Sequence, residues 1–324
     1  VLHQFGHTGG LRKIQAQTLE QENPKSTLML RNYFTIALRN LRKHSFYSFI
    51  NIAGLSVGVS ICLVILLFVH NELQYDKHHH KAERIYRVHA TIDFAGNHYD
   101  MTYAPAPMAA TLATEFPEVE AAVRFRERGS YLIKRDNENI KESNVIWTDK
   151  DFFKIFTVPV LAGNPESALA EPNAIAISKK VADKFFPNEN ALGQTLVLDN
   201  TMNMKVTAVY ENMPASSHFH FDVLIAMAGL EEAQRPFWYS NNFQTYFLLR
   251  EKADIKNLES KFPDMIAKHV MPQMKEILGG DFTVEKFAEA GNKIQYSAQP
   301  LTDIHLKSNL QGEFEPNFDI TYVY

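Results

Sequence analysis

The stretch that decides the fold is Ser45–Val69, SFYSFINIAGLSVGVSICLVILLFV. It runs for about 25 residues without Asp, Glu, Lys or Arg, so a helix of this length can cross a hydrocarbon core of roughly 30 Å with some tilt. A buried core helix seldom runs so long without a charge. A cleaved signal peptide fits badly, because its apolar region spans about 7–15 residues and ends at small residues, whereas this stretch ends in the bulky run Leu66–Val69. We therefore predict a transmembrane helix over residues 45–70.

The charges beside this stretch predict its orientation. The basic residues that precede it are Arg31, Arg39, Arg42 and Lys43. Glu72 and Asp76 follow it directly, and lysines appear only further along. By the positive-inside rule, the N-terminal side lies in the cytoplasm and the chain after His70 lies outside.

Residues 29–44 show the pattern of an amphipathic helix. Its apolar face is formed by Leu30, Tyr33, Phe34, Ala37, Leu38 and Leu41, and the opposite face is basic. Beside a membrane span, this pattern favours a helix on the cytoplasmic membrane surface, with Arg31, Arg39, Arg42 and Lys43 as membrane-surface residues. A solvated helix with an ordinary apolar stripe is the alternative. Residues 1–28 show no sustained period, and we expect a flexible leader there.

The composition excludes several classes of protein. The 324 residues include 33 Lys and Arg, 37 Asp and Glu, and 45% apolar residues, for a net charge of -4. These values rule out a wholly disordered acidic chain and a strongly basic nucleic-acid binder. One cysteine rules out an intramolecular disulfide framework and a cysteine-clustered zinc or iron–sulfur site. The length allows roughly two domains.

Beyond the span, the pattern is that of a mixed α+β domain. Alternating apolar and polar residues predict strands near residues 86–94, 123–126, 219–225, 243–249 and 294–298. Helices are predicted from Pro105 to Phe116 and over Asp254–Leu278, the second kinked or split by Pro263 and Pro272. Strand–helix–strand units at both ends of the region suggest one sheet domain that carries an inserted domain.

The inserted part has its own signals. Ala174–Ile177 is a short apolar strand candidate, and Ser178 is a good N-cap for a helix over Lys179–Phe186. Further strands are expected near residues 195–197 and 206–210, with a turn at Asp199–Asn200 between them. We therefore predict a first part of the sheet subdomain at 71–129, an inserted β-rich subdomain at 130–217, and a second part of the sheet subdomain at 218–310.

Candidates for chemistry are few. The sequence has no G-x-x-x-x-G-K-[ST] motif, so it lacks the phosphate-binding loop of P-loop ATPases. Three adjacent histidines, His78–His80, cannot all face one ion. His218, His220 and Asp222 are a better metal candidate, because alternate residues of a strand share one face. The competing interpretation is the polar face of a strand whose other face is apolar.

The span carries one motif with a mechanical meaning. Gly54 and Gly58 form G-x-x-x-G, and with Ala53 they give a small-residue surface that another helix can approach closely. Glycine is also common in membrane helices for other reasons. We treat Ala53, Gly54 and Gly58 as candidate helix-packing residues.

Five stretches carry a resemblance to a known family. In chain order they are LRNYFTIALRNLRKHSFYSFINIAGLSVGVS (Leu30–Ser60), ERIYRV (Glu83–Val88), DFFKIFTVPVLAGNPESALAEPNAIAISKKVADKFF (Asp151–Phe186), NMPASSHFHFD (Asn212–Asp222) and PLTDIHL (Pro300–Leu306). From Met29 onward, the sequence resembles the permease subunits of ABC transporters of the macrolide-exporter and lipoprotein-release type (MacB-like and FtsX-like), in the form common among Bacteroidetes-like bacteria.

The resemblance implies a specific organisation. The family has a first transmembrane helix, a large periplasmic domain with a βαβ-type porter-like subdomain and an inserted smaller β-rich one, and then three more transmembrane helices. No second apolar stretch of spanning length precedes Tyr324. We therefore expect the first helix and the periplasmic domain only, with residues 311–324 approaching a second helix that is missing here.

The resemblance also implies a function. It points to a non-catalytic permease subunit in the bacterial inner membrane, with its N-terminus in the cytoplasm and its main domain in the periplasm. The implied partners are a cytoplasmic ATPase subunit that binds the ATP, a second permease copy in a dimer, the lipid bilayer and a periplasmic partner, with no cofactor or nucleic acid on this chain. The alternative is a single-span sensor with a ligand-binding extracytoplasmic domain.

Overall fold

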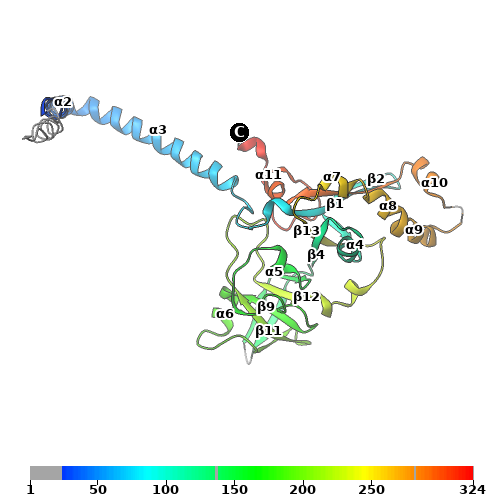
Figure 1. The fold of residues 1–324 in the computed structure, drawn as a ribbon. Helices are drawn as coiled ribbons and strands as arrows, with labels where there is room; N and C mark the ends of the chain where they lie inside the picture. The colour runs from blue at the N-terminus through cyan, green and yellow to red at the C-terminus, as the bar shows by residue number, and fades with distance from the viewer. Residues whose placement is uncertain (1–23, 136–137, 281, 324) are drawn as a thin grey trace, which may run out of the picture. The chain divides into compact units, whose positions relative to one another are not determined.

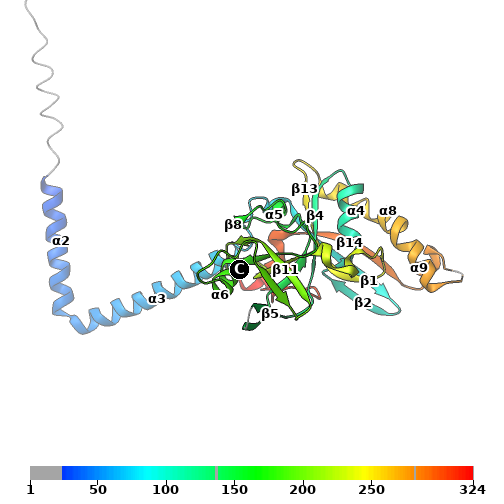
Figure 2. The ribbon, with the colours of Figure 1, turned by 90° about the horizontal axis from the view of Figure 1, so that it is seen from below.

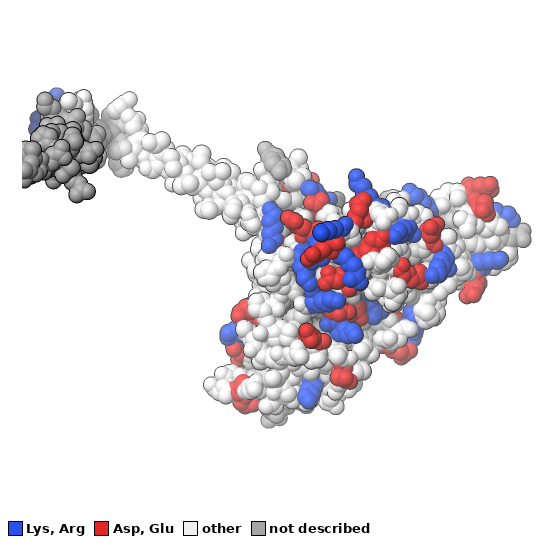
Figure 3. Space-filling model, viewed as in Figure 1, with Lys and Arg blue, Asp and Glu red and all other residues white. Residues whose placement is uncertain are grey.

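The apolar stretch forms one uninterrupted helix, α3 (Ser45–Glu72), of 28 residues. The computed structural model describes residues 24–135, 138–280 and 282–323. Among these residues, α3 is the one helix long and apolar enough to cross a membrane, and none of its most apolar window is buried. Figure 3 shows most of it as a rod without Lys, Arg, Asp or Glu. The chain divides after Phe68 into two compact units.

The helix before α3 starts earlier than the sequence pattern predicted. Helix α2 spans Pro24–Lys43, so residues 24–28 are helical and do not belong to a flexible leader. Proline is tolerated in the first turn of a helix, because the backbone N–H that it lacks has no partner there. The rest of the predicted leader, residues 1–23, lies outside the described residues.

The domain after Val69 is mixed α+β, which confirms the predicted fold class (Figure 1). Its described strands are hydrogen-bonded into one sheet, along the order β14-β1-β13-β4-β7-β12-β9-β11-β10-β5-β6. Off this path, β2 pairs with β1, β3 with β13 and β8 with β11. The strands nearest α3 in sequence and their partners are β1 (Ile85–Phe94), β2 (Asn97–Met101), β3 (Tyr103–Pro105), β4 (Val119–Arg126), β13 (Asn241–Leu249) and β14 (Lys293–Pro300).

Residues 131–226, most of which lie in the predicted insertion, contribute the other strands of the sheet. These strands are β5 (Tyr131–Arg135), β6 (Glu138–Glu142), β7 (Val145–Thr148), β8 (Val160–Gly163), β9 (Ala174–Ser178), β10 (Thr195–Leu198), β11 (Met202–Tyr210) and β12 (Val223–Ala226). Ser178 caps α6 (Lys179–Phe185) by accepting a hydrogen bond from the Val181 N–H at 3.2 Å, as predicted. Asp199 and Asn200 both have positive φ in the hairpin turn.

The boundary at residue 217 stays a prediction. Strand β12 pairs in parallel with β7 and antiparallel with β9, and β7 pairs in turn with β4. The chain returns to the first group of strands only with β13. The division into two subdomains stays a prediction.

Short helices cover one face of the β1–β14 region (Figure 2). They are α4 (Met108–Glu115), α7 (Ile255–Glu259), α8 (Phe262–Met265), the π-helical segment η4 (Ile266–Val270), α9 (Met271–Leu278) and α10 (Val284–Glu289). Pro263 and Pro272 lie in the first turns of α8 and α9, so the predicted splitting of the 254–278 helix is confirmed. The predicted helix start at Pro105 is wrong, because Pro105 ends β3 and α4 begins after Pro107. A residue before proline avoids the helical region, which excludes Ala106 from a helix.

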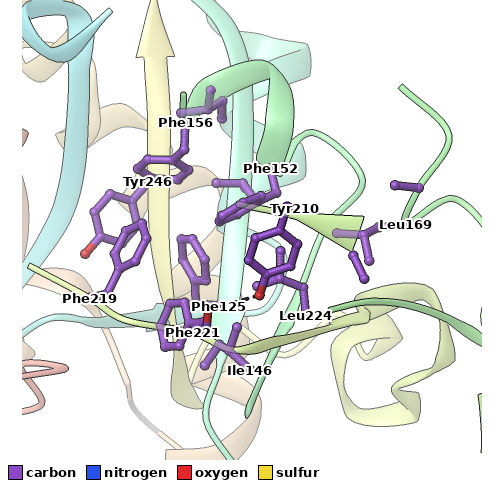
Figure 4. Close-up of a cluster of buried hydrophobic side chains, with 14 of the residues drawn as sticks. Phe125, Ile146, Phe152, Phe156, Leu169, Tyr210, Phe219, Phe221, Leu224 and Tyr246 are labelled. Atoms are coloured by element: carbon purple, nitrogen blue, oxygen red, sulfur yellow. Dashed lines mark hydrogen bonds between the residues drawn. The ribbon is translucent and has the colours of Figure 1, made fainter. Parts of the chain in front are cut away.

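A cluster of buried hydrophobic side chains, rich in aromatic rings, forms one part of the domain's core (Figure 4). Its labelled members are Phe125, Ile146, Phe152, Phe156, Leu169, Tyr210, Phe219, Phe221, Leu224 and Tyr246. Phe152 belongs to α5 (Phe152–Ile155). Phe219 and Phe221 precede β12 and are not in a strand, which corrects the prediction for 219–225. They still point into the same cluster, with ring centroids 5.0 Å apart. Alternation therefore predicted their burial correctly and their secondary structure wrongly.

The C-terminal segment is part of the domain. After α11 (Ile304–Lys307), the chain runs back along the sheet, and Gln311 exchanges backbone hydrogen bonds with Asp100 and Thr102. The carbonyl of Gly312 accepts hydrogen bonds from Thr102 and Gln244. Residues 311–318 are therefore bonded to β2, β13 and other parts of the domain.

Candidate functional site

Buried charged residues gather where α3 ends and in the turns that follow it. Glu72 is the last residue of the helix, and Asp76 and His79 lie in the turns after it. These three side chains are 8%, 0% and 2% exposed. Charged residues are rarely so buried unless they are paired. We call Glu72–Lys81 the junction, because it leads from the apolar helix into the sheet.

The first contact of the junction is a carboxylate–imidazole pair. Glu72 Oε2 lies 2.6 Å from His305 Nε2, and both side chains are at most about a tenth exposed. The Tyr75 ring stacks on the His305 imidazole, with centroids 3.3 Å apart and planes 5° from parallel. Burial, and then the nearby Glu72 carboxylate, raise the pKa of Tyr75, so the hydroxyl stays neutral. The end of the helix is thereby fixed to α11.

The second contact is centred on Asp76. Its backbone has φ of 59°, and its N–H donates to the Ser216 carbonyl at 2.8 Å. Its Oδ1 accepts from the His218 N–H at 3.1 Å and from His218 Nδ1 at 2.8 Å. Burial acts to raise the pKa of Asp76, but the charge and hydrogen bonds of His218 outweigh it and hold this pKa below its usual range. Asp76 is thus an ionised, fully buried anchor for the 212–222 loop.

The contact continues across the sheet. His218 Nε2 lies 2.9 Å from the Tyr246 hydroxyl on β13, and this hydroxyl also interacts with the Arg87 guanidinium on β1. Arg87 has no exposed side-chain surface and binds both carboxylate oxygens of Glu313, at 2.5 and 2.8 Å. Burial acts to raise the pKa of Glu313, but the hydrogen bonds and charge of Arg87 outweigh it and lower this pKa. A buried polar chain therefore links Asp76, where the chain enters the domain, with Glu313 in the C-terminal segment.

The structure does not bring the predicted metal triplet together. His218 faces Asp76 and Tyr246, whereas His220 contacts Glu315 at 2.6 Å. Asp222 accepts hydrogen bonds from Ser178 at 3.0 Å and Lys180 at 2.7 Å. The residues lie in an irregular segment, so they do not share one strand face. Among the described residues, no group of three or more His, Cys, Asp or Glu side chains could hold a metal ion.

The other predicted residues lie on the two N-terminal helices. Gly54 and Gly58 are exposed, and an added Cβ would meet nothing within 4 Å at either position. Ala53 is half-buried. The side chains of Arg31, Arg39, Arg42 and Lys43 are exposed on α2. Their roles in helix packing and at the membrane surface stay predictions.

Sequence reasoning missed most of the junction. It considered Glu72 and Asp76 only as flanking charges, and it did not single out Tyr75, Arg87 or Glu313. His218, the partner of Asp76, and His305, the partner of Glu72, do lie in stretches that carried the family resemblance, NMPASSHFHFD and PLTDIHL. Acidic residues directly after a span, together with separate histidine-containing motifs, were the available signal.

An apolar helix joined to a mixed α+β domain is the make-up of a membrane-anchored protein with an extracytoplasmic domain. The chain belongs to the MacB-like periplasmic core domain family, whose model matches residues 48–264. This is a family of ABC transporter permease components, which are not themselves enzymes. No curated protein sequence gives a significant match.

Solved structures resemble the domain. A domain assigned to a permease protein of Porphyromonas gingivalis matches with a TM-score of 0.57 and 21% identity, over 68% of this chain and 91% of that one. The periplasmic region of MacB from Actinobacillus actinomycetemcomitans matches with a TM-score of 0.45 and 11% identity, over 69% of this chain and 91% of that one. The extracellular domain of the ABC-type transporter YknZ from Gram-positive bacteria matches with a TM-score of 0.42 and 13% identity, over 66% of this chain and 99% of that one. The first of these similarities supports the fold.

Proposed function

We propose that this chain is a permease subunit that transmits motion between a separate cytoplasmic ATPase and its own extracytoplasmic domain. The observation that carries the proposal is the junction, where Glu72 at the end of the apolar helix is paired with α11, and Asp76 in the turns after it is paired with the 212–222 loop. A flexible linker at this point would absorb any displacement of the helix. Buried and hydrogen-bonded, the junction passes displacement on to the sheet.

Several parts of this function lie with partners. The chain has no phosphate-binding loop, so energy would come from ATP bound by the ATPase subunit. One helix cannot enclose a path through a bilayer, so the open face at Ala53, Gly54 and Gly58 would pack on a further helix, in this or a second permease copy. Export of a substrate and purely mechanical signalling to a periplasmic partner are both compatible with this arrangement.

Coupling can be tested at Asp76 in the full-length permease, reconstituted with its ATPase subunit. Asp76→Ala removes the acceptor for His218 and is expected to reduce ATP-driven output by at least roughly tenfold, while assembly of the complex is retained. The matched control is Asp93→Ala, which removes a carboxylate that pairs with the exposed His98. Unchanged output of the assembled Asp76→Ala complex would contradict the proposed role of the junction.

The proposed topology places α2 in the cytoplasm and the sheet domain in the periplasm of a bacterial inner membrane. The basic residues before α3 and the acidic residues after it motivate this orientation. In intact spheroplasts of a strain that carries Cys62→Ser, a cysteine at Asn200 should react with a membrane-impermeant maleimide, and a cysteine at Thr35 should react only after lysis. The reverse labelling would overturn the orientation.

A further inference from the structure

His79 holds together two segments that are far apart in the sequence. Its Nδ1 accepts a hydrogen bond from the Thr157 backbone N–H at 3.0 Å. In return, the His80 N–H donates to the Thr157 hydroxyl at 2.9 Å. The reciprocal pair fastens the junction to the segment after α5. We call these two hydrogen bonds the clasp.

The geometry assigns one protonation state to the closed clasp. A ring nitrogen that accepts a hydrogen bond carries no proton, so the His79 proton lies on Nε2. An imidazolium has protons on both nitrogens and cannot accept from Thr157. The imidazole is 2% exposed, with the Phe156 ring at a centroid distance of 5.3 Å and the Phe219 ring at 6.4 Å, so water cannot readily take over as a partner.

We propose that His79 makes the clasp a pH-sensitive latch, which is closed when the imidazole is neutral and is released when it is protonated. The released ring can turn toward the Asp76 carboxylate, whose Oδ1 already lies 4.0 Å from Nε2. Protonation thus exchanges a bond to the α5 segment for an ion pair within the junction. The latch lies on the junction, so its role in coupling rests on the proposed function. The state of the clasp itself can be measured without any transport assay.

The charged and titratable groups around His79 act in opposite directions. Asp76 favours the protonated ring. His78, whose ring centroid is 3.9 Å away, and His218 from the 212–222 loop oppose a further positive charge. From the α5 side, the contacts are Phe156 and the Thr157 N–H, neither of which titrates. Burial is the largest influence and, with His78, lowers the pKa of His79 to about 3 while the clasp is closed.

The sign and size of the pH effect follow from linkage. When the clasp is released, the ring returns toward its ordinary pKa of 6.5, and the Asp76 carboxylate favours its protonated form. At pH values between about 3 and 6.5, His79 is protonated in the released state but neutral in the closed state. Acidification therefore favours release. Between pH 7.5 and pH 5.5, the ratio of closed to released clasp should fall by about tenfold. An extracytoplasmic domain is exposed to such changes in environmental pH.

Hydrogen exchange of the full chain in lipid nanodiscs tests the latch. Protection of the peptide that covers residues 151–160, corrected for intrinsic exchange rates, should fall about tenfold from pH 7.5 to pH 5.5. In His79→Asn, the amide oxygen replaces Nδ1 as an acceptor but cannot be protonated, and the fall should be less than twofold. The matched control is His80→Asn, which keeps the backbone donor and should behave like the wild type.

Two results would overturn the latch. One is a wild-type protection factor that does not change with pH, and the other is an equal fall in His79→Asn. If that variant does not fold, nitrogen NMR of histidine-labelled wild type gives a second reading. It should find the His79 proton on Nε2 at pH 7.5, and a proton on Nδ1 would rule out the clasp.

Discussion

Glu313→Ala is expected to destabilise the domain by about 3–5 kcal/mol, the typical cost of removing one partner from a buried ion pair. Arg87 has no exposed side-chain surface, and Glu313 is the carboxylate that it binds. Without it, the guanidinium keeps Gln299 and Ser308 as hydrogen-bonding partners, at 2.6 and 3.0 Å, but neither carries a compensating charge. Thermal unfolding of the full chain in detergent, followed by circular dichroism, measures the loss.

Glu315→Ala is the matched control for this variant. Glu315 lies two residues away and pairs with the partly exposed His220, and its own side chain is 41% exposed. A solvent-exposed pair contributes roughly 0–1 kcal/mol. Equal effects of the two substitutions would mean that the Arg87–Glu313 pair does not hold the C-terminal segment.

The second large effect is expected from truncation. A fragment of residues 70–323 should be soluble and unfold cooperatively, whereas a fragment of residues 70–310 should aggregate or lack a cooperative transition. The shorter fragment loses Glu313, the Phe314 ring that packs against Phe125 and Phe221, and the Gly312 carbonyl that Gln244 binds. Size-exclusion chromatography and thermal melts of the two fragments measure the difference. Identical melts would show that the C-terminal segment adds nothing to the fold.

The expectation that the domain needs residues 311–323 replaces the end of the sheet subdomain that the sequence suggested, at residue 310. The pattern of residues 311–324 has no regular period, and a family resemblance predicted only that another helix should follow. Arg87 could not reveal its partner either, because it alternates with apolar residues like any polar residue on a half-exposed strand. Its full burial depends on a segment more than two hundred residues further along the chain.

Local signals predicted the elements well where one residue type decides the geometry. Ser178 as a cap, Asp199–Asn200 as a turn, and the prolines that split residues 254–278 are examples. The pairing of β12 could not be predicted in this way, since an apolar strand of four residues fits either half of the sheet. The junction was also hidden, because each of its pairs joins positions distant in sequence. His218 was noticed for a metal, whereas its partners are Asp76 and Tyr246.

In the proposed mechanism, the last turn of α3, residues 69–72, moves together with the sheet. Double electron–electron resonance tests this in nanodiscs, on a Cys62→Ser background with spin labels at the exposed positions Asn71 and Lys141. We predict one narrow distance distribution for the otherwise unmodified chain, and a clearly broader one when Glu72→Ala and Asp76→Ala are combined. A distribution that is already broad in the unmodified junction, and unaffected by these substitutions, would contradict the claim.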